Sequence, residues 1–547
     1  MEHELIRVAG RAVACAAFGS FAGGASGAGP IDPPAEPVRS TMKPLDAIEP
    51  RICVNDLPGS ATGVHRITEP GVYFLRADVL GEVGKRGIEV DLSGIDPTES
   101  ASSSVVIELQ GFSLVGVPGS DDAVHVNGGV QLEESVSIHG MTGIGHPRFS
   151  TVRGWGGDGI EFVAVESVSV SGVDVTDCRG NGLRASSNPK SMRAKCYTSH
   201  FNCDLSGVSI TSPFGGQNNI ELRGIESSGN GVHGVDLSWG PSADDSDGGG
   251  TAVKIFDTEL DGNGGDGLRA DGGIRRHSVD MMAHEVMASG NGGNGLTIIG
   301  DRERSMDMSI DMDVMTAGGN GGWGMRLVRA VARLARCVTR RNVSGGLAIE
   351  ETVADASRCR SSENGGSGVV ATGSAVTFHV CHFVANGGGP TGGSGLEIRG
   401  SHPQDNSCDG VVASDNRGHG VHVVDASAPL SLLGCSLGEN DLDGLSVESL
   451  LGVPTGPVHV LDSSADANGL AGLRLSSSQG GVVRRCSANG NGGAGMIIGG
   501  TSCLVVSNSV ADNAGGTILA MPKNTVGPLV DETGAATNTN PGVNYVR

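Results

Sequence analysis

Aromatic and basic residues are both scarce in this chain of 547 residues. Its 11 Phe, 3 Tyr and 3 Trp make up only 3% of the sequence, which disfavours a long sugar-binding cleft built from stacked rings. Lys and Arg number 38 against 61 Asp and Glu, for a formal net charge of −23. Because no basic stripe is available to displace counterions from phosphates, the composition excludes DNA or RNA binding.

Long apolar runs and clustered cysteines are also missing. Beyond the N-terminus, no apolar run reaches the ~18 residues that span a bilayer. The 12 cysteines never occur in CxxC spacing, which disfavours a structural zinc cluster. In an exported chain they could form disulfides. The spacing of 22 residues between Cys337, Cys359 and Cys381 instead favours buried thiols stacked in a column.

The N-terminus has the layout of a signal peptide. Arg7 and Arg11 precede an apolar run from Ala12 to Ala22, and small residues follow. We therefore predict a signal peptide over residues 1–28 and a secreted or extracellular protein, with the cell surface as a further location. The acidic balance is compatible with that environment and with divalent cations.

Glycine is in excess: it accounts for 91 of the 547 residues, whereas a share of ~7% is usual. The phrase GxGxxG occurs at 262–267, 290–295, 319–324 and 490–495. One nucleotide site needs one such turn, at the start of a long helix. Here four copies precede short apolar segments such as Leu268-Arg269-Ala270. The phrase therefore indicates a structural repeat, and we expect no nucleotide.

Aligned on its last glycine, the phrase recurs every 22 to 33 residues, which is typical of a solenoid. An apolar-x-apolar triplet follows each glycine and predicts a short strand. The repeat glycines are Gly159, Gly182, Gly207, Gly234, Gly267, Gly295, Gly324, Gly346, Gly368, Gly395, Gly420, Gly444, Gly472 and Gly495.

Asparagine stands four residues before ten of the repeat glycines. Asn tolerates the left-handed backbone of a tight turn, and its amide both donates and accepts hydrogen bonds. Stacked at the strand spacing of ~4.8 Å, these amides would form a ladder along the solenoid axis. The ten are Asn230, Asn263, Asn291, Asn320, Asn342, Asn364, Asn416, Asn440, Asn468 and Asn491.

A period of 22 residues or more fits three short strands and three turns per coil. The short apolar runs and the Gly and Asn of every unit exclude a helical solenoid. We predict an all-β chain, a single parallel β-helix over residues 63–520 with roughly 17 coils. Residues 29–62 would form a linker and lead-in, and residues 521–547 a C-terminal tail or cap.

The repeat unit N-G-x-x-G-[LVIM]-x-apolar resembles the repeats of the pectin-lyase-like superfamily. Segments 70–75, 106–114 and 152–160 and the tail from Asn524 resemble one group of secreted bacterial proteins in it, a group without a settled biochemical role. This resemblance implies a right-handed β-helix. Enzymes of this superfamily act on pectins or related polyuronates through acidic residues on the outer surface of the β-helix. The resemblance therefore also implies candidate chemistry: the lyases use calcium and an Arg or Lys base, and the hydrolases use paired aspartates.

The catalytic patterns of those enzymes are incomplete here. Gly418-His419-Gly420 matches the GHG motif of the hydrolases, but Gly420 is also a repeat glycine. The acidic pairs Asp121-Asp122 and Asp244-Asp245 lack the residues that surround the paired aspartates of the superfamily. The repeat itself is therefore the better explanation of the motif.

Stacking creates two further sets of candidate catalytic residues. In three successive coils the position before the repeat glycine holds Ser394, His419 and Asp443, roughly 5 Å apart along one turn. A row of this kind could orient a nucleophile and a base, or it could arise at a turn position that is always polar. Two residues after the glycine, Glu397 lies beside His422.

Candidate metal ligands occur at two places. Counting from the repeat glycines puts His284 beside Asp313, and Asp311 beside Arg333, on an outward face. Calcium or substrate binding is one interpretation, and cross-strand charge pairs on a solvated sheet are the commoner one. The acidic loop with Asp244, Asp245 and Asp247 has the composition of a calcium loop, although solvated loops of this kind are commonly empty.

These observations predict a secreted, non-catalytic β-helix rod that binds polysaccharide or cell-envelope material. We expect a monomer with no membrane span and no organic cofactor, and calcium stays open. The alternative is a carbohydrate-active enzyme on the same fold, a polyuronate lyase, hydrolase or epimerase. The absence of a complete catalytic set favours the first prediction.

Overall fold

The computed structural model describes residues 51–95, 103–129, 134–140, 150–186, 191–197, 199–212, 217–239, 250–272, 278–300, 308–390, 392–400, 402–452, 454–531 and 540–547. The predicted signal peptide and the loop with Asp244, Asp245 and Asp247 lie outside these residues. The segment Arg51–Arg547 forms one compact unit. Among the described residues, no helix is long and apolar enough to cross a membrane.

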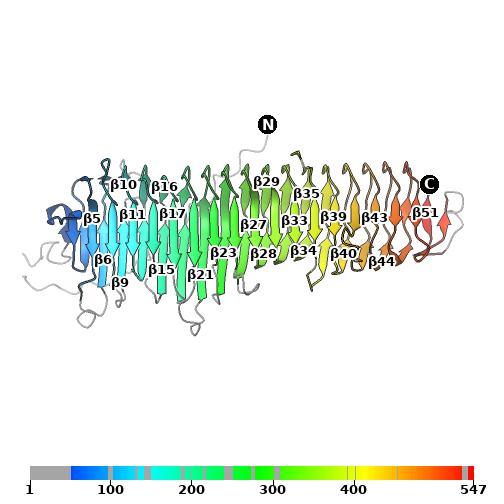
Figure 1. Cartoon of the computed structure of the whole chain (residues 1–547), viewed down its shortest axis with the longest axis horizontal. Coiled ribbons are helices and arrows are strands. Elements are labelled where there is room, and N and C mark those ends of the chain that lie inside the picture. Colours follow the sequence, from blue (N-terminus) through cyan, green and yellow to red (C-terminus); the bar gives the residue numbers. More distant parts are fainter. Residues whose placement is uncertain are drawn as a thin grey trace, which may run out of the picture. The chain divides into compact units, whose positions relative to one another are not determined.

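Arg51–Arg547 is a parallel β-helix, as predicted, because strands of successive coils pair side by side in chain order (Figure 1). The column that follows the repeat glycines, called sheet B here, holds eighteen of the described strands, one per coil. They are β2 (Gly63–Ile67), β5 (Arg86–Asp91), β8 (Val124–Asn127), β11 (Ile160–Val163), β14 (Leu183–Ser186), β17 (Val208–Ser212), β20 (Val235–Trp239), β22 (Leu268–Asp271), β24 (Leu296–Ile299), β27 (Trp323–Val328), β30 (Gly345–Glu350), β33 (Val369–Thr372), β36 (Leu396–Arg399), β39 (Val421–Val424), β41 (Leu445–Glu448), β43 (Leu473–Leu475), β45 (Met496–Ile498) and β48 (Ile518–Ala520).

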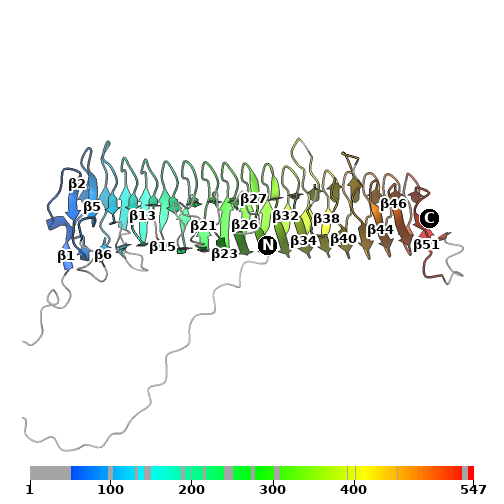
Figure 2. The same cartoon turned by 60° about the horizontal axis from the view of Figure 1, so that its bottom comes forward.

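A second column of strands runs along the next face of each coil (Figure 2). It contains β3 (Gly71–Phe74), β6 (Ser103–Glu108), β9 (Glu134–His139), β12 (Ser167–Ser171), β15 (Ser191–Tyr197), β18 (Gln217–Arg223), β21 (Gly250–Glu259), β23 (Ser278–Ser289), β25 (Met308–Asp313), β28 (Val331–Ala335), β31 (Val353–Ser357), β34 (Ala375–His379), β37 (Asn406–Asp409), β40 (Leu430–Leu433), β42 (Val458–Leu461), β44 (Gln479–Arg484), β46 (Thr501–Val506) and β49 (Thr525–Val526).

The third column holds shorter strands. They are β4 (Val79–Leu80), β7 (Leu114–Val115), β10 (Ser150–Arg153), β13 (Val173–Thr176), β16 (His200–Asn202), β19 (Glu226–Ser227), β26 (Thr316–Gly318), β29 (Val338–Arg340), β32 (Arg360–Ser362), β35 (His382–Val384), β38 (Val412–Ser414), β47 (Ser509–Val510) and β51 (Asn544–Val546), with β50 (Leu529–Val530) beside β51. Long β21 and β23 reach into this column, where they pair with β19 and β26.

Strand pairing extends beyond residues 63 and 520 at both ends. At the first end, β1 (Arg51–Cys53) pairs with β3, and the short 3-10 helix η1 (Val54–Asp56) follows it. At the other end, β51 pairs with both β47 and β50. The terminal strands thus cover part of the open edges that a solenoid presents to solvent.

The core follows from the alternation of each strand, because every second side chain points inward. The predicted column of cysteines is part of it: Cys337, Cys359 and Cys381 are buried in successive coils. All described cysteines are free thiols, and only Cys53 among them is not buried. Packing, and not covalent cross-linking, therefore holds the described coils together.

A sharp corner separates the second and third columns. The residue at this corner has a positive φ, for example Arg336 (55°), Arg358 (53°) and Val380 (53°). This left-handed conformation reverses the direction in which the following side chain points, so each of these residues precedes an inward cysteine. L-residues adopt it at a cost of about 1–2 kcal/mol each, which the surrounding stack must offset.

The asparagine ladder is present and longer than predicted. Each side-chain amide nitrogen donates to the amide oxygen of the next coil over 2.8 to 3.0 Å. Two asparagines of the ladder were not predicted. Asn386 lies nine residues before Gly395 because an inserted loop separates them, and Asn513 precedes Thr517, which replaces the repeat glycine.

Candidate functional site

The outward face of sheet B carries a register of side chains, called the outer column here, which are polar except for Ala348 and Val370. Its residues stand two positions after the repeat glycine, and strand pairing places each beside the next. Many of them are half-buried or buried although they face outward. In order they are Glu89, His125, Glu161, Arg184, Ser209, Asp236, Arg269, Thr297, Arg326, Ala348, Val370, Glu397, His422, Ser446 and Arg474.

Beside it runs a turn column, formed by the residue immediately before each repeat glycine. Its side chains accept hydrogen bonds from the backbone N–H of the equivalent residue in the next coil. The acceptors are Asp122, Asp158, Asn181, His233, Asp266, Asn294, Ser367, Ser394, His419 and Asp443. A polar residue at this position therefore satisfies a backbone donor that would otherwise have no partner.

The structure brings Ser394, His419 and Asp443 together in the turn column, as their spacing predicts. Ser394 Oγ accepts the backbone N–H of His419 over 3.2 Å, and His419 Nδ1 accepts the backbone N–H of Asp443 over 3.2 Å. Since Nδ1 is an acceptor, the ring proton of neutral His419 sits on Nε2. Asp443 is held by two hydrogen bonds from Arg474, at 2.9 and 3.2 Å. These contacts give the row a structural role, and catalysis by it stays a prediction.

Glu397 and His422 belong to a second group on the same face. His422 Nε2 lies 2.8 Å from an oxygen of Glu448, and its Nδ1 lies 3.6 Å from Glu397. Arg399 donates to Glu397 over 2.7 Å. The rings of His419 and His422 are 4.5 Å apart, which joins the turn column and the outer column into one histidine cluster.

The pKa values of the two histidines in this cluster are shifted in opposite directions. Burial, reinforced by the neighbouring His422, lowers the pKa of His419 to about 4. Burial also acts to lower the pKa of His422, but its interactions with Glu397 and Glu448 outweigh that effect and raise it. The structure therefore holds a neutral ring against a ring that favours its charged form.

Acid is expected to weaken the coils around His419. Its folded-state pKa of about 4 lies below the ordinary 6.5, so the unfolded chain binds a proton first as pH falls between these values. This contribution to stability is complete above pH 6.5 and is lost as pH falls toward 4. We expect the urea midpoint to fall less between pH 7 and 5 in His419→Asn than in the wild type.

His419→Asn is a conservative test because Asn occupies the same column at positions 181 and 294. There its Oδ1 accepts the next backbone N–H, at 3.2 and 2.6 Å. The variant thus keeps an acceptor and removes the titrating group. An equal pH dependence of the urea midpoint in both proteins would contradict the role assigned to His419.

A second buried cluster, absent from the sequence prediction, lies nearer the N-terminus of sheet B. His125 Nδ1 is 2.6 Å from Glu161 Oε2 and 3.3 Å from Asp122 Oδ2. Although burial acts to lower the pKa of His125, these two carboxylates raise it to about 9. The coil was missed because Ala123 replaces the repeat glycine, so the glycine series begins one coil later, at Gly159.

The predicted metal ligands on the second column have the expected neighbours. His284 pairs in register with Asp313, and Asp311 with Arg333. Asp313 accepts two hydrogen bonds from Arg336, and His284 Nδ1 lies 3.4 Å from it. These side chains are partly exposed, and the contacts observed are ion pairs. A calcium site here stays a prediction.

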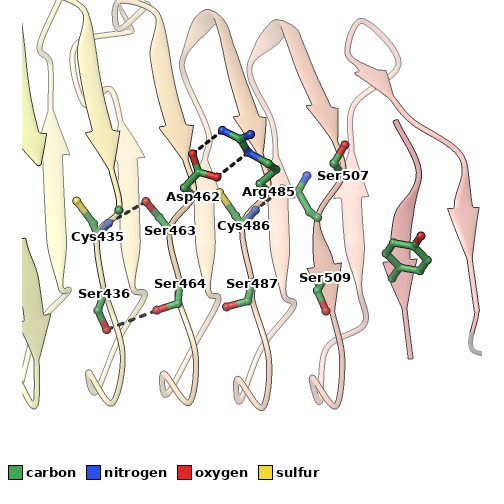
Figure 3. A pocket seen from close by; sticks show the side chains of 13 residues that line it. Cys435, Ser436, Asp462, Ser463, Ser464, Arg485, Cys486, Ser487, Ser507 and Ser509 are labelled. Atoms are coloured by element: carbon green, nitrogen blue, oxygen red, sulfur yellow. Dashed lines mark hydrogen bonds and ion pairs between the residues drawn. The ribbon is translucent and has the colours of Figure 1, made fainter. Parts of the chain in front are cut away.

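A hollow of about 530 Å³ lies on the third-column side near the C-terminus (Figure 3). Ser436, Ser464, Ser487 and Ser509 stack along it, and an Asp462–Arg485 ion pair lies beside them. Tyr545 pairs in register with Ser509. Its lining residues include no histidine and only one carboxylate, that of Asp462.

Solved structures with a similar course of the chain include two epimerases. The A-module of a mannuronan C-5 epimerase from Azotobacter vinelandii is 12% identical, with a TM-score of 0.34, and the match covers 76% of this chain and 99% of that one. A periplasmic alginate epimerase is 11% identical, with a TM-score of 0.33 and coverage of 76% and 83%. Tailspike protein 3 of bacteriophage CBA120 is 10% identical, with a TM-score of 0.23 and coverage of 90% and 65%.

The strand pairing decides the fold. The chain is a parallel β-helix protein. No family model matches the sequence of this β-helix protein, and the search of curated proteins found no match either. Its function is therefore argued from its own residues.

Proposed function

We propose that this β-helix protein is a non-catalytic rod that binds polysaccharide along the outer column of sheet B. The supporting observation is the unbroken polar register from Glu89 to Arg326. Parallel strands repeat every ~4.8 Å, so the column offers one hydrogen-bonding side chain at each step. A polymer with repeating hydroxyl or carboxylate groups is the kind of ligand that such a row would match.

Two of the three tryptophans are unavailable for ring stacking, which favours binding by hydrogen bonds, and the third, Trp323, is half-buried in the turn column. Trp155 and Trp239 are buried in the core, so they cannot act as platforms for sugar rings. The outer column instead contains three arginines held by carboxylates on its own sheet, Arg184 beside Glu161 and two further along it. Arg269 lies 3.4 Å from Asp271, and Arg326 donates to Glu350 over 2.9 and 3.1 Å. These pairs fix the guanidinium groups before a ligand arrives, which lowers the cost of ordering them.

The double substitution Arg269→Ser with Arg326→Ser tests this binding face. Serine already occurs in the outer column at positions 209 and 446, so the strands should be retained. Charge-assisted hydrogen bonds contribute about 1.5–3 kcal/mol each, so we expect affinity for a bound polysaccharide to fall at least about tenfold. Binding to a glycan array and to soluble uronate polymers, with and without calcium, would measure it.

The matched control is Arg341→Ser with Arg485→Ser. These arginines are also exposed and ion-paired, to Glu363 and Asp462, but they lie outside sheet B. Their loss should leave affinity unchanged. An equal loss in both double variants, or no polysaccharide binding by the wild type, would refute the proposed face.

The histidine cluster favours a second candidate function, a carbohydrate-active lyase, hydrolase or epimerase. Neighbouring titratable groups with opposite pKa shifts are a frequent arrangement of an acid and a base. His422, held between Glu397 and Glu448, would be the proton donor. Release of unsaturated or reducing ends from the polymers above, or a changed uronate epimer, would replace the non-catalytic proposal by this one.

A further inference from the structure

We propose that Asp122, His125 and Glu161 form a binding site for one divalent transition-metal ion of the zinc, cobalt or manganese class. The ligand atoms of these three residues all lie within 4.8 Å of one another. Asp122 and His125 are buried, and Glu161 is half-buried. One imidazole nitrogen with two carboxylate oxygens is a donor set that suits these metals, whereas calcium takes oxygen ligands alone.

Each carboxylate has one oxygen in contact with another group and the other directed at His125. Asp122 Oδ1 accepts the backbone N–H of Asp158 over 2.7 Å, which leaves Oδ2 facing His125. Glu161 Oε1 lies 3.4 Å from Arg184, which leaves Oε2 facing His125. Such outer contacts orient metal ligands before an ion arrives. The two free oxygens and His125 Nδ1 therefore point toward one position. In the metal-free protein the Nδ1 proton lies there, and a cation could replace that proton.

The local charge also favours a cation. Five carboxylates, those of Glu89, Asp121, Asp122, Asp158 and Glu161, stand against Arg86, Arg184 and one imidazole. Arg86 Nε is 3.9 Å from Asp122 Oδ2 and makes no hydrogen bond, so it does not saturate that oxygen. Three protein ligands would leave coordination positions for water or for a ligand group at this end of the outer column.

The histidine cluster supplies an internal comparison. His422 also lies between two carboxylates, but it meets Glu448 through Nε2 and Glu397 through Nδ1. Its partners therefore lie on opposite sides of the ring and cannot converge on one ion. Among the residues that the structure describes, only the arrangement around His125 brings two carboxylate oxygens to the same nitrogen of an imidazole.

Cobalt titration of the full chain, freed of metal by a chelator, tests the site. We expect one equivalent of Co²⁺ to bind with a visible absorption band, and Zn²⁺ to displace it while millimolar Ca²⁺ does not. His125→Asn and Asp122→Asn should weaken Co²⁺ binding by roughly 100-fold or more, because even outer contacts of metal ligands contribute about 10–100-fold. Asn at position 122 keeps the acceptor for the Asp158 N–H.

The control is His422→Asn, which should bind Co²⁺ like the wild type. Thermal unfolding would confirm that each variant is folded, and Glu161→Gln replaces any variant that is not. No stoichiometric binding by the wild type, unchanged binding by a folded ligand variant, or an equal loss in His422→Asn would each overturn the proposal. The result is independent of polysaccharide binding, because the assay contains no sugar.

Discussion

Replacing Asn342 by alanine is expected to destabilise the β-helix by about 3–5 kcal/mol. The side chain is buried, and its amide makes four hydrogen bonds. Its nitrogen donates to Ala317 O and to Asn364 Oδ1, and its oxygen accepts two N–H groups of Asn320. Each buried group left without a partner costs about 1–3 kcal/mol, and alanine supplies neither donor nor acceptor.

The loss should be concentrated in neighbouring coils, because each coil of a solenoid contacts only the next. Hydrogen exchange of backbone amides in residues 317–346, together with the urea midpoint, would measure it. The control is Val343→Ala, which alters the adjacent side chain. That side chain is 68% exposed, so its truncation should stay within about 0.5 kcal/mol. Equal exchange rates in the two variants would show that the ladder contributes no stability of its own.

Gly267→Ala is expected to have the second-largest effect, about 1–3 kcal/mol through overpacking. A Cβ atom at this position would lie 2.7 Å from Gly295 O, 2.9 Å from Asn291 Nδ2 and 3.0 Å from Ala288 Cβ. Two of these neighbours belong to the backbone and to the ladder, so neither can move without breaking other contacts. Urea unfolding of the variant would give the change in midpoint.

A substitution at Gly262, in the same GxGxxG phrase, distinguishes the effect of crowding from the effect of backbone conformation. Its φ is +66°, but a Cβ there would meet nothing within 4 Å. Asparagine adopts this left-handed conformation readily, so Gly262→Asn should change stability by less than about 0.5 kcal/mol. If Gly262→Asn shifts the urea midpoint as much as Gly267→Ala does, the explanation by crowding is wrong.

The repeat made the fold predictable, because the recurring glycine marks the start of the sheet B strand in each of fourteen coils. Counting from Gly267 or Gly420 places a side chain on the correct column. The pairs His284–Asp313 and Asp311–Arg333 lie side by side as expected. The glycine series from Gly159 to Gly495 left out four of the eighteen described strands of sheet B, among them those where Ala123 and Thr517 replace the glycine.

Knowing the column to which a residue belongs predicts its position better than it predicts the contacts of its side chain. Ser394, His419 and Asp443 stack as the spacing predicts, but sequence could not show that each bonds to a backbone N–H of the next coil. The direction of a lone pair depends on rotamers and on neighbours from other strands. The convergence of Asp122, His125 and Glu161 depends on the same details, and no sequence motif predicts it.

The asparagine ladder also gives the β-helix an electrical direction. Every side-chain amide from Asn230 to Asn491 donates toward the next coil, and none of these bonds runs backward. Aligned amide dipoles add, as peptide dipoles do in an α-helix, and hydrogen bonds in a chain polarise one another. The Asn230 end of the stack is therefore the negative pole and the Asn513 end the positive pole, so its two ends present different fields to whatever approaches them.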